Sequence, residues 1–179
     1  MTASTQQSLI ISALGEDKPG LVEKLAETIM DTGCTVLDSR MVSLGGDFAA
    51  VTQVTGPWNA LAKLEQKLAE LETKLGMTLQ SRRTAKPEAS GSLLPYAVEV
   101  VALDQPGIVY NLANFFASRD INISEVATTS YAAPHTGTGM FAVNMHVHIP
   151  SEIKVAAIRE EFMMFCDSMN LDAVIEPAK

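Results

Sequence analysis

A short polar motif, Asp-x-Pro-Gly, occurs twice in the chain, as Asp17-Lys18-Pro19-Gly20 and as Asp104-Gln105-Pro106-Gly107. Each occurrence follows a short apolar run and precedes apolar residues at helical spacing, which predicts a strand-to-helix corner. The first N–H groups of a helix have no acceptor inside the helix, and the helix dipole adds partial positive charge there. Glycine has no Cβ and lets the backbone approach a ligand closely. Such a corner can therefore bind a carboxylate without Lys or Arg.

We expect a small amino acid at one or both corners, glycine first. The N–H groups of Gly107 and Ile108 would take its carboxylate, and the side-chain oxygen of Asn122, at the start of the next strand, would meet its ammonium group. The first copy has Thr35 in place of Asn122, so we expect it to bind more weakly or to serve structure. A second arrangement is a ligand that bridges the two copies, with its carboxylate at one and its ammonium at the other. The alternative is that Asp17 and Asp104 serve only as N-caps. The candidate ligand-binding residues are Asp17, Pro19, Gly20, Leu21, Asp104, Pro106, Gly107, Ile108 and Asn122.

Other residues that could do chemistry form weaker patterns. His146 and His148 share a face of a predicted strand and could bind a metal, but no third ligand is evident, so a solvated or interface sheet face is favoured. Cys34 and Cys166 lie far apart, without a Cys-x-x-Cys pattern. No nucleophile has a visible His/Asp partner arrangement. We therefore expect no catalytic residues, no metal and no cofactor.

An internal repeat positions the two corners. Asp104 follows Asp17 by 87 positions, and at this offset six of the ten residues from Asp17 to Ala26 are identical to those from Asp104 to Ala113. The match extends through Val36/Ile123 and Asp38/Glu125. Residues 85–92 are polar and rich in Pro, Gly and Ser, as is typical of a linker. The sequence thus predicts one domain over 1–84, a linker over 85–92 and a second domain over 93–179.

Within each copy the apolar period changes in the same order, strand, helix, two strands, helix and strand. This βαββαβ pattern predicts an α+β fold of two ferredoxin-like domains, each an antiparallel sheet with its helices on one face. Ser151 is the expected N-cap of the last helix, and Gly33 and Asp120 are expected where the first helix of each copy ends. The predicted ranges are 9–14, 21–29, 34–44, 48–54, 59–75 and 77–81 in the first copy, and 97–103, 108–116, 121–131, 141–147, 151–169 and 171–175 in the second.

Charge excludes one class of partner. Thirteen Lys and Arg against twenty-one Asp and Glu give a net charge of −8. This balance argues against direct binding of nucleic acid, which needs clustered positive charge. No apolar run approaches the ~20 residues of a membrane-spanning helix, and the start of the chain lacks the pattern of a signal peptide. We expect no membrane association and a cytoplasmic location.

Two βαββαβ units that each carry Asp-x-Pro-Gly at the first helix resemble tandem ACT domains, the amino-acid-sensing modules of metabolic regulation. Asp120-Ile121-Asn122-Ile123 is similar to the Asn-Ile that begins the second strand in that family. The first copy, Gly33-Cys34-Thr35-Val36, departs from this pattern. The resemblance covers nearly the whole chain and implies an amino-acid-binding regulator.

A narrower resemblance is to the family of glycine cleavage system transcriptional repressors. It rests on Leu9–Gly15, Asp38-Ser39-Arg40, Gly56–Leu61 and Asn170–Pro177. It implies a non-enzymatic regulator that responds to glycine and represses glycine cleavage genes through contact with a DNA-binding activator protein. A homodimer is possible. The alternative is a regulatory subunit or detached amino-acid sensor of a metabolic enzyme.

Overall fold

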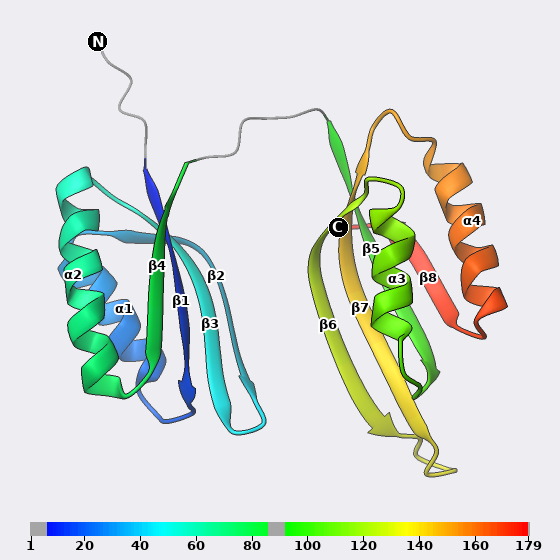
Figure 1. The fold of residues 1–179 in the computed structure, drawn as a ribbon, viewed down its shortest axis with the longest axis horizontal. Coiled ribbons are helices and arrows are strands. Elements are labelled where there is room, and N and C mark those ends of the chain that lie inside the picture. Colours follow the sequence, from blue (N-terminus) through cyan, green and yellow to red (C-terminus); the bar gives the residue numbers. More distant parts are fainter. Residues whose placement is uncertain (1–6, 86–91, 179) are drawn as a thin grey trace. The chain divides into compact units, whose positions relative to one another are not determined.

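A computed structural model describes residues 7–85 and 92–178 (Figure 1). The chain divides into two compact units, Met1–Glu88 and Ala89–Lys179, here called unit 1 and unit 2. The last strand of unit 1 ends at Thr84 and the first strand of unit 2 begins at Leu93. Most of the predicted linker, residues 86–91, lies outside the described residues, so the predicted boundaries at 84 and 93 stay predictions.

The order of elements in each unit is βαββαβ, and the predicted fold class is confirmed. Unit 1 consists of β1 (Ser8–Glu16), α1 (Leu21–Asp31), β2 (Thr35–Leu44), β3 (Asp47–Thr55), α2 (Trp58–Leu75) and β4 (Thr78–Thr84). Unit 2 consists of β5 (Leu93–Leu103), α3 (Ile108–Ala117), β6 (Asn122–Ala132), β7 (Gly139–Pro150), α4 (Val155–Ser168) and β8 (Asp172–Pro177).

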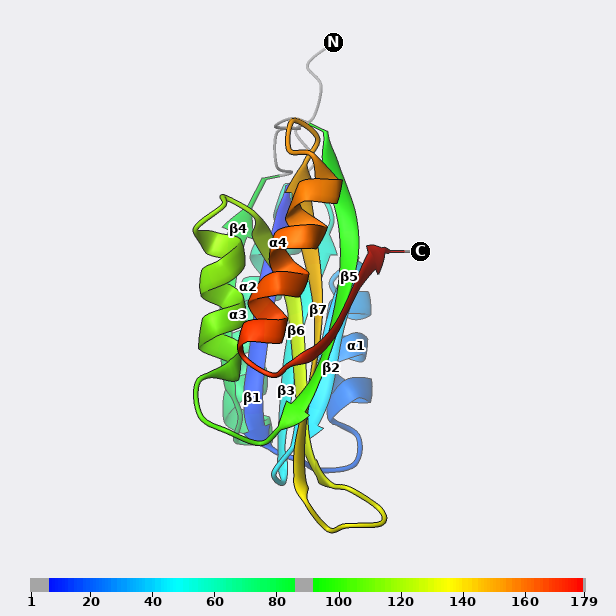
Figure 2. The ribbon, with the colours of Figure 1, turned by 90° about the vertical axis from the view of Figure 1, so that its right-hand side faces the viewer.

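Each unit contains one four-stranded antiparallel sheet, in the order β2-β3-β1-β4 or β6-β7-β5-β8. Both helices of a unit cover the same face of its sheet, as Figures 1 and 2 show. The two units also share a β-bulge at corresponding positions. β2 has a bulge between Val36 and Asp38, and β6 has one between Ile123 and Glu125. The two copies therefore share their local backbone deviations as well as their topology.

The core of each unit lies between the sheet and its helices. In unit 1 the leucines of α2 at three- and four-residue spacing pack against the sheet. Unit 2 is built around the fully buried Phe116 and Phe162, whose rings lie 5.3 Å apart. Burying such a side chain contributes about 1.5–3 kcal/mol.

The helix ends confirm one expectation and correct another. Gly33 and Asp120 both adopt left-handed backbone, with φ of 79° and 55°, where α1 and α3 end. Ser151 is not an N-cap, because residues 151–153 form a turn, closed by the N–H of Ile153 donating to the carbonyl of Pro150, and α4 begins only after Lys154. In the described part of the chain, none of the helices combines the length and apolar character needed to cross a membrane.

Candidate ligand-binding corners

The two Asp-x-Pro-Gly corners have the same backbone conformation. Gly20 has φ 91° and ψ −2°, and Gly107 has φ 92° and ψ −2°. This left-handed conformation costs an L-residue roughly 1–2 kcal/mol, which glycine avoids. The glycine of the motif is thus required by the path of the chain, in addition to the close approach that it permits.

Glycine, not aspartate, holds the N-cap position of both helices. α1 begins at Leu21 directly after Gly20, and α3 begins at Ile108 directly after Gly107. Among the described residues no side chain caps either helix by a hydrogen bond. The interpretation of Asp17 and Asp104 as N-caps is therefore wrong, since each lies three residues before the cap.

Each corner presents backbone donors that the helix does not use. The first bond inside α1 runs from the N–H of Lys24 to the carbonyl of Gly20 at 2.9 Å, and in α3 the N–H of Asn111 bonds Gly107 at the same distance. The N–H groups between cap and first donor have no acceptor within the helix. Leu21 and Ile108 are 5% and 2% exposed as whole residues, so their side chains are buried and do not offer a surface to a ligand.

The aspartates tie the corners to the neighbouring strand connections. The Asp17 N–H donates to the carbonyl of Gly46 at 2.9 Å, and the Ser43 hydroxyl donates to the Asp17 carboxylate at 2.6 Å. In unit 2 the Asp104 N–H donates to the carbonyl of Gly139 at 3.0 Å. Sequence reasoning missed these contacts, although the predicted antiparallel return through residues 45–47 places that turn beside the end of β1.

Asn122 does not lie beside the Gly107 corner. Asn122 pairs with His148, which pairs with Pro95 near the start of β5, whereas the corner follows Leu103 at the end of β5. Eight residues of strand separate Pro95 from Leu103, or about 27 Å at ~3.4 Å per residue. One small amino acid cannot span that distance, so the predicted pairing of Gly107 and Asn122 around one ligand within unit 2 is wrong. The reason is topological, because α3 returns the chain to the opposite end of the sheet before β6 begins.

Thr35, the counterpart of Asn122 in unit 1, is separated from its own corner in the same way. Thr35 pairs with Thr55, and Thr55 pairs with Ser8 at the start of β1, whereas Gly20 follows the end of that strand. The difference between Thr35 and Asn122 therefore does not distinguish the two corners as sites within a unit.

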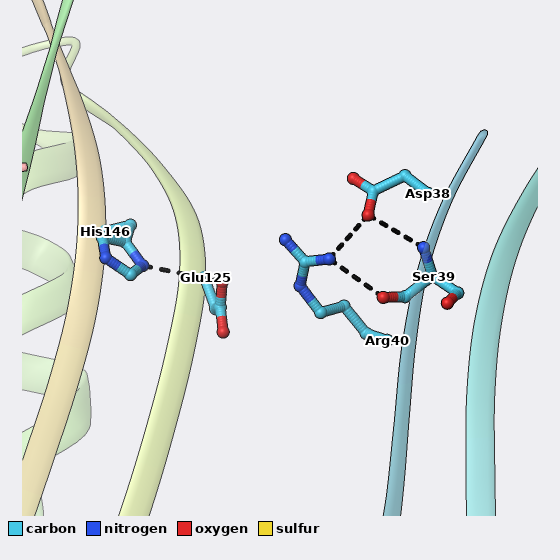
Figure 3. Close-up of polar contacts among 5 residues, drawn as sticks. All are labelled: Asp38, Ser39, Arg40, Glu125 and His146. Atoms are coloured by element: carbon cyan, nitrogen blue, oxygen red, sulfur yellow. Dashed lines mark hydrogen bonds and ion pairs between the residues drawn. The ribbon is translucent and has the colours of Figure 1, made fainter. Parts of the chain in front are cut away.

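Polar side chains accompany both bulged strands (Figure 3). In unit 1 the Arg40 guanidinium donates to the Asp38 carboxylate at 2.7 Å and to the Ser39 carbonyl at 2.9 Å, and the Ser39 N–H donates to Asp38 at 2.8 Å. In unit 2 His146 Nδ1 lies 3.5 Å from the Glu125 carboxylate. All these contacts are at the surface and hold the strands' side chains in place.

The two histidines lie on the sheet face that carries no helices. Met145 and Val147, which alternate with them along β7, are buried. Glu125 is opposite His146 and Asn122 is opposite His148 in the strand register. Within residues 7–85 and 92–178, no three His, Cys, Asp or Glu side chains gather closely enough to hold a metal ion.

Both cysteines are buried and free. Burial raises the pKa of the Cys166 thiol to about 12, with a smaller contribution from the charge of Asp167. A thiol with such a pKa is protonated at neutral pH, so Cys166 is a packing residue and not a nucleophile.

The comparisons with known proteins match the repeat and its fold. Residues 7–82 match the family model of the ACT domain. The glycine cleavage system transcriptional repressors of Escherichia coli (strain K12) and Shigella flexneri are each 27% identical to the chain over 175 residues, which is 98% of the chain and 92% of the relative.

Two solved structures extend the likeness to the pair of units. The crystal structure of a protein proposed to be a glycine cleavage system transcriptional repressor has a TM-score of 0.74 at 22% identity and covers 98% of this chain and 99% of that one. The crystal structure of an unknown protein from Galdieria sulphuraria has a TM-score of 0.78 at 25% identity and covers 97% of this chain and 99% of that one. The two-unit fold is thus shared from end to end.

Proposed function

We propose that this chain is a tandem ACT-domain protein and a non-enzymatic, amino-acid-responsive regulator of transcription, because residues 7–82 match the ACT domain model and the chain resembles the glycine cleavage system transcriptional repressors along almost its whole length. It represses glycine cleavage genes indirectly, by contact with a DNA-binding activator protein in the cytoplasm. The proposal takes its regulatory role from the relatives' names and its ligand chemistry from the corners.

The observation that carries the ligand proposal is that the two corners have the same backbone conformation. Gly20 and Gly107 have φ values of 91° and 92°, and each precedes a helix that no side chain caps by a hydrogen bond in the described part of the chain. Each corner offers backbone N–H groups and the positive end of a helix dipole to a carboxylate. The ligand is a small amino acid, with glycine as the first choice.

The ammonium group needs a different partner from the one that the sequence suggested. Asp104 is exposed and lies in the same corner as Gly107, so we assign the ammonium of the ligand to its carboxylate. Pro106 fixes the backbone between these two residues. Asn122 lies too far from the Gly107 corner to contact a ligand bound there. In unit 1 the Asp17 carboxylate already accepts a hydrogen bond from Ser43, so we expect the unit 2 corner to bind more tightly.

The charge of the chain supports an indirect mode of repression. The net charge is −8, and residues 93–179 carry four basic and ten acidic side chains, a net −6. Such a surface repels the phosphate backbone, whereas a basic DNA-binding protein is attracted to it.

A reporter of glycine cleavage gene expression tests this function in cells with and without the chain. We expect the chain to lower expression, and added glycine to relieve that repression. In parallel, a gel shift with the purified chain and the promoter at ~100 mM salt should show no sequence-selective complex at submicromolar concentration. Non-specific binding to DNA has a dissociation constant of about 10⁻⁴–10⁻⁶ M, so a submicromolar complex would indicate specific binding. Unchanged expression, or selective DNA binding by the chain alone, would contradict the proposal. Glycine-dependent association with a metabolic enzyme, without any effect on the reporter, would identify the chain as an enzyme's sensor.

A further inference from the structure

Unit 2 has an open groove between α3 and α4, the two helices that lie side by side in Figure 2. Its volume is about 420 Å³. Two amides, a hydroxyl and three apolar side chains form most of its lining: Asn111, Asn114, Ser118, Phe115, Met164 and Phe165. The remaining two lining residues are Arg119 and Glu161.

The charged pair of the groove is fully engaged within unit 2. Arg119 Nε donates to Glu161 at 2.9 Å, and Arg119 Nη1 donates to the carbonyl of Phe115 at 2.9 Å. The guanidinium also stacks 3.9 Å from the centre of the Phe115 ring. The guanidinium thus covers the ring of Phe115, which is buried, and the accessible apolar side chains of the groove are Met164 and Phe165.

Unit 1 has a groove at the matching place, between α1 and α2, and its lining is charged. Six of its eight lining residues are charged: Lys24, Glu27, Asp31, Lys67, Glu70 and Lys74. Lys24 forms an ion pair with Glu27 at 2.8 Å, and Lys67 lies 4.0 Å from Asp31. This is the composition of a solvated helix face.

The repeat makes the comparison residue by residue. At the offset of 87, Lys24, Glu27, Thr28 and Asp31 of α1 correspond to Asn111, Asn114, Phe115 and Ser118 of α3. At the offset that aligns the apolar positions of α2 and α4, Glu70 corresponds to Met164. The fold forms this groove in both units. At these corresponding positions unit 2 has neutral or apolar side chains where unit 1 has mostly charged ones.

Large apolar side chains are exposed beside this groove. Met164 is 67% exposed on α4, and Tyr110, one helical turn before Asn114 on α3, is 72% exposed. α3 contains no charged residue at all. Tyr and Met are enriched where proteins bind partners, and an open groove between two helices can receive the apolar side of a third helix.

We propose that the α3–α4 groove of unit 2 is the docking site for an amphipathic helix of the protein partner, with apolar residues toward Met164 and Phe165 and Lys or Arg at its edges. The charge of unit 2 selects the basic edges, because α4 carries three acidic residues against the single basic Arg159 and the unit has a net charge of −6. The inference deepens the proposed function, on which it rests for the existence of a protein partner.

Photo-crosslinking from two matched positions tests the groove. A photoreactive phenylalanine analogue replaces Met164 in one version of the full chain and Glu70, its counterpart in unit 1, in another, and each is irradiated in the native host cell. We expect an adduct at least tenfold more abundant from position 164, and the crosslinked peptide should form an amphipathic helix with basic residues at its edges. Equal adducts from both positions, no adduct from position 164, or an adduct only to a second copy of the chain would overturn the proposal.

A variant that places the charged pair of α1 on α3 tests the groove without disturbing the fold. The double variant Asn111→Lys/Asn114→Glu reproduces on α3 the Lys24–Glu27 pair of α1 and leaves the net charge unchanged. Its control is Lys24→Asn/Glu27→Asn in unit 1. With circular dichroism spectra equal to that of the unchanged chain, we expect the α3 variant to lose at least tenfold of the 164 adduct and most of the repression, and the α1 variant to lose neither. Retention of both by the α3 variant would overturn the groove proposal.

The two readouts separate the groove from the proposed function. If the unchanged chain fails to repress the reporter, the proposed function fails, and the crosslink still decides the groove. If the unchanged chain represses and the α3 variant does so equally, the groove fails and the proposed function stands.

Discussion

Replacing Gly20 or Gly107 by alanine tests whether the left-handed backbone conformation of the corners requires glycine. A Cβ added to Gly107 would meet the Asn111 side-chain nitrogen at 3.5 Å, and one added to Gly20 would meet the Glu23 carboxylate at 3.9 Å. Both distances are ordinary van der Waals contacts, so the new methyl groups fit. The cost of either substitution therefore comes from the left-handed conformation alone.

The expected loss of stability is the difference between two opposing effects of the substitution. An L-residue at φ near +90° loses roughly 1–2 kcal/mol relative to glycine. Alanine recovers about 0.4–1 kcal/mol because it restricts the unfolded chain. The net expectation is a loss of about 1 kcal/mol for each variant, and the same loss in both units because the two conformations are the same.

Urea unfolding measures the loss, and the chain provides its own probes. The single tryptophan, Trp58, lies in unit 1 and reports Gly20→Ala by fluorescence, while circular dichroism reports Gly107→Ala. With a slope of ~1–2 kcal/mol per molar urea, the midpoint should fall by about 0.5–1 M. The matched control is Gly139→Ala, which has ordinary φ and whose Cβ would lie 3.7 Å from that of Asp104. If Gly107→Ala unfolds at the same urea concentration as that control, the backbone argument is refuted.

Three further predictions concern the cores and the surface of the units. Phe162→Ala should cost unit 2 about 3–5 kcal/mol and abolish its cooperative thermal transition, because the ring is fully buried; a normal transition by circular dichroism would contradict this. Hydrogen bonds from Arg83 lower the pKa of Glu65 below 4.5, so the pair stabilises unit 1 above pH 4.5, and that contribution is lost as pH falls through the lowered pKa. Arg83→Met should therefore lower the free energy of unfolding by about 0.5–1 kcal/mol at pH 7 and by less at pH 3, measured by urea unfolding at each pH. A loss of the same size at both pH values would refute this. Cys34 and Cys166 should resist an aromatic disulfide reagent at pH 8 until urea unfolds the chain, and rapid labelling of both in the folded state would contradict their burial.

The fold was predictable from sequence because two independent signals agree. The change of apolar period defines the order of elements, and the repeat from Asp17 and Asp104 shows that this order occurs twice. Even the left-handed residues at the ends of α1 and α3 follow from Gly33 and its counterpart Asp120. The start of α4 did not follow, because β7 continues to Pro150 and the next residues make a turn that uses Ser151 before any helix begins.

The candidate site was predictable only in part. The corners follow from Asp-x-Pro-Gly, but the left-handed glycine and the contact between Ser43 and Asp17 depend on backbone geometry that no short pattern specifies. Asn122 was misplaced because adjacency along the chain was taken for adjacency in space, although a helix that crosses the sheet reverses the end at which the next strand begins. The α3–α4 groove needs the packed helix pair to be seen, even though its residue changes are visible once Lys24 is aligned with Asn111.

Titration calorimetry with glycine and the purified full chain tests the central claim that a corner binds the carboxylate of a small amino acid. We predict a saturable heat with glycine, alanine or serine at millimolar concentration, and none with glycinamide, which keeps the ammonium group but lacks the carboxylate. The same amino acid should raise the unfolding temperature of the chain. The absence of heat and of any stability shift with all three amino acids, or equal heats from glycine and glycinamide, would show that the Asp-x-Pro-Gly corners are structural turns and would contradict the account.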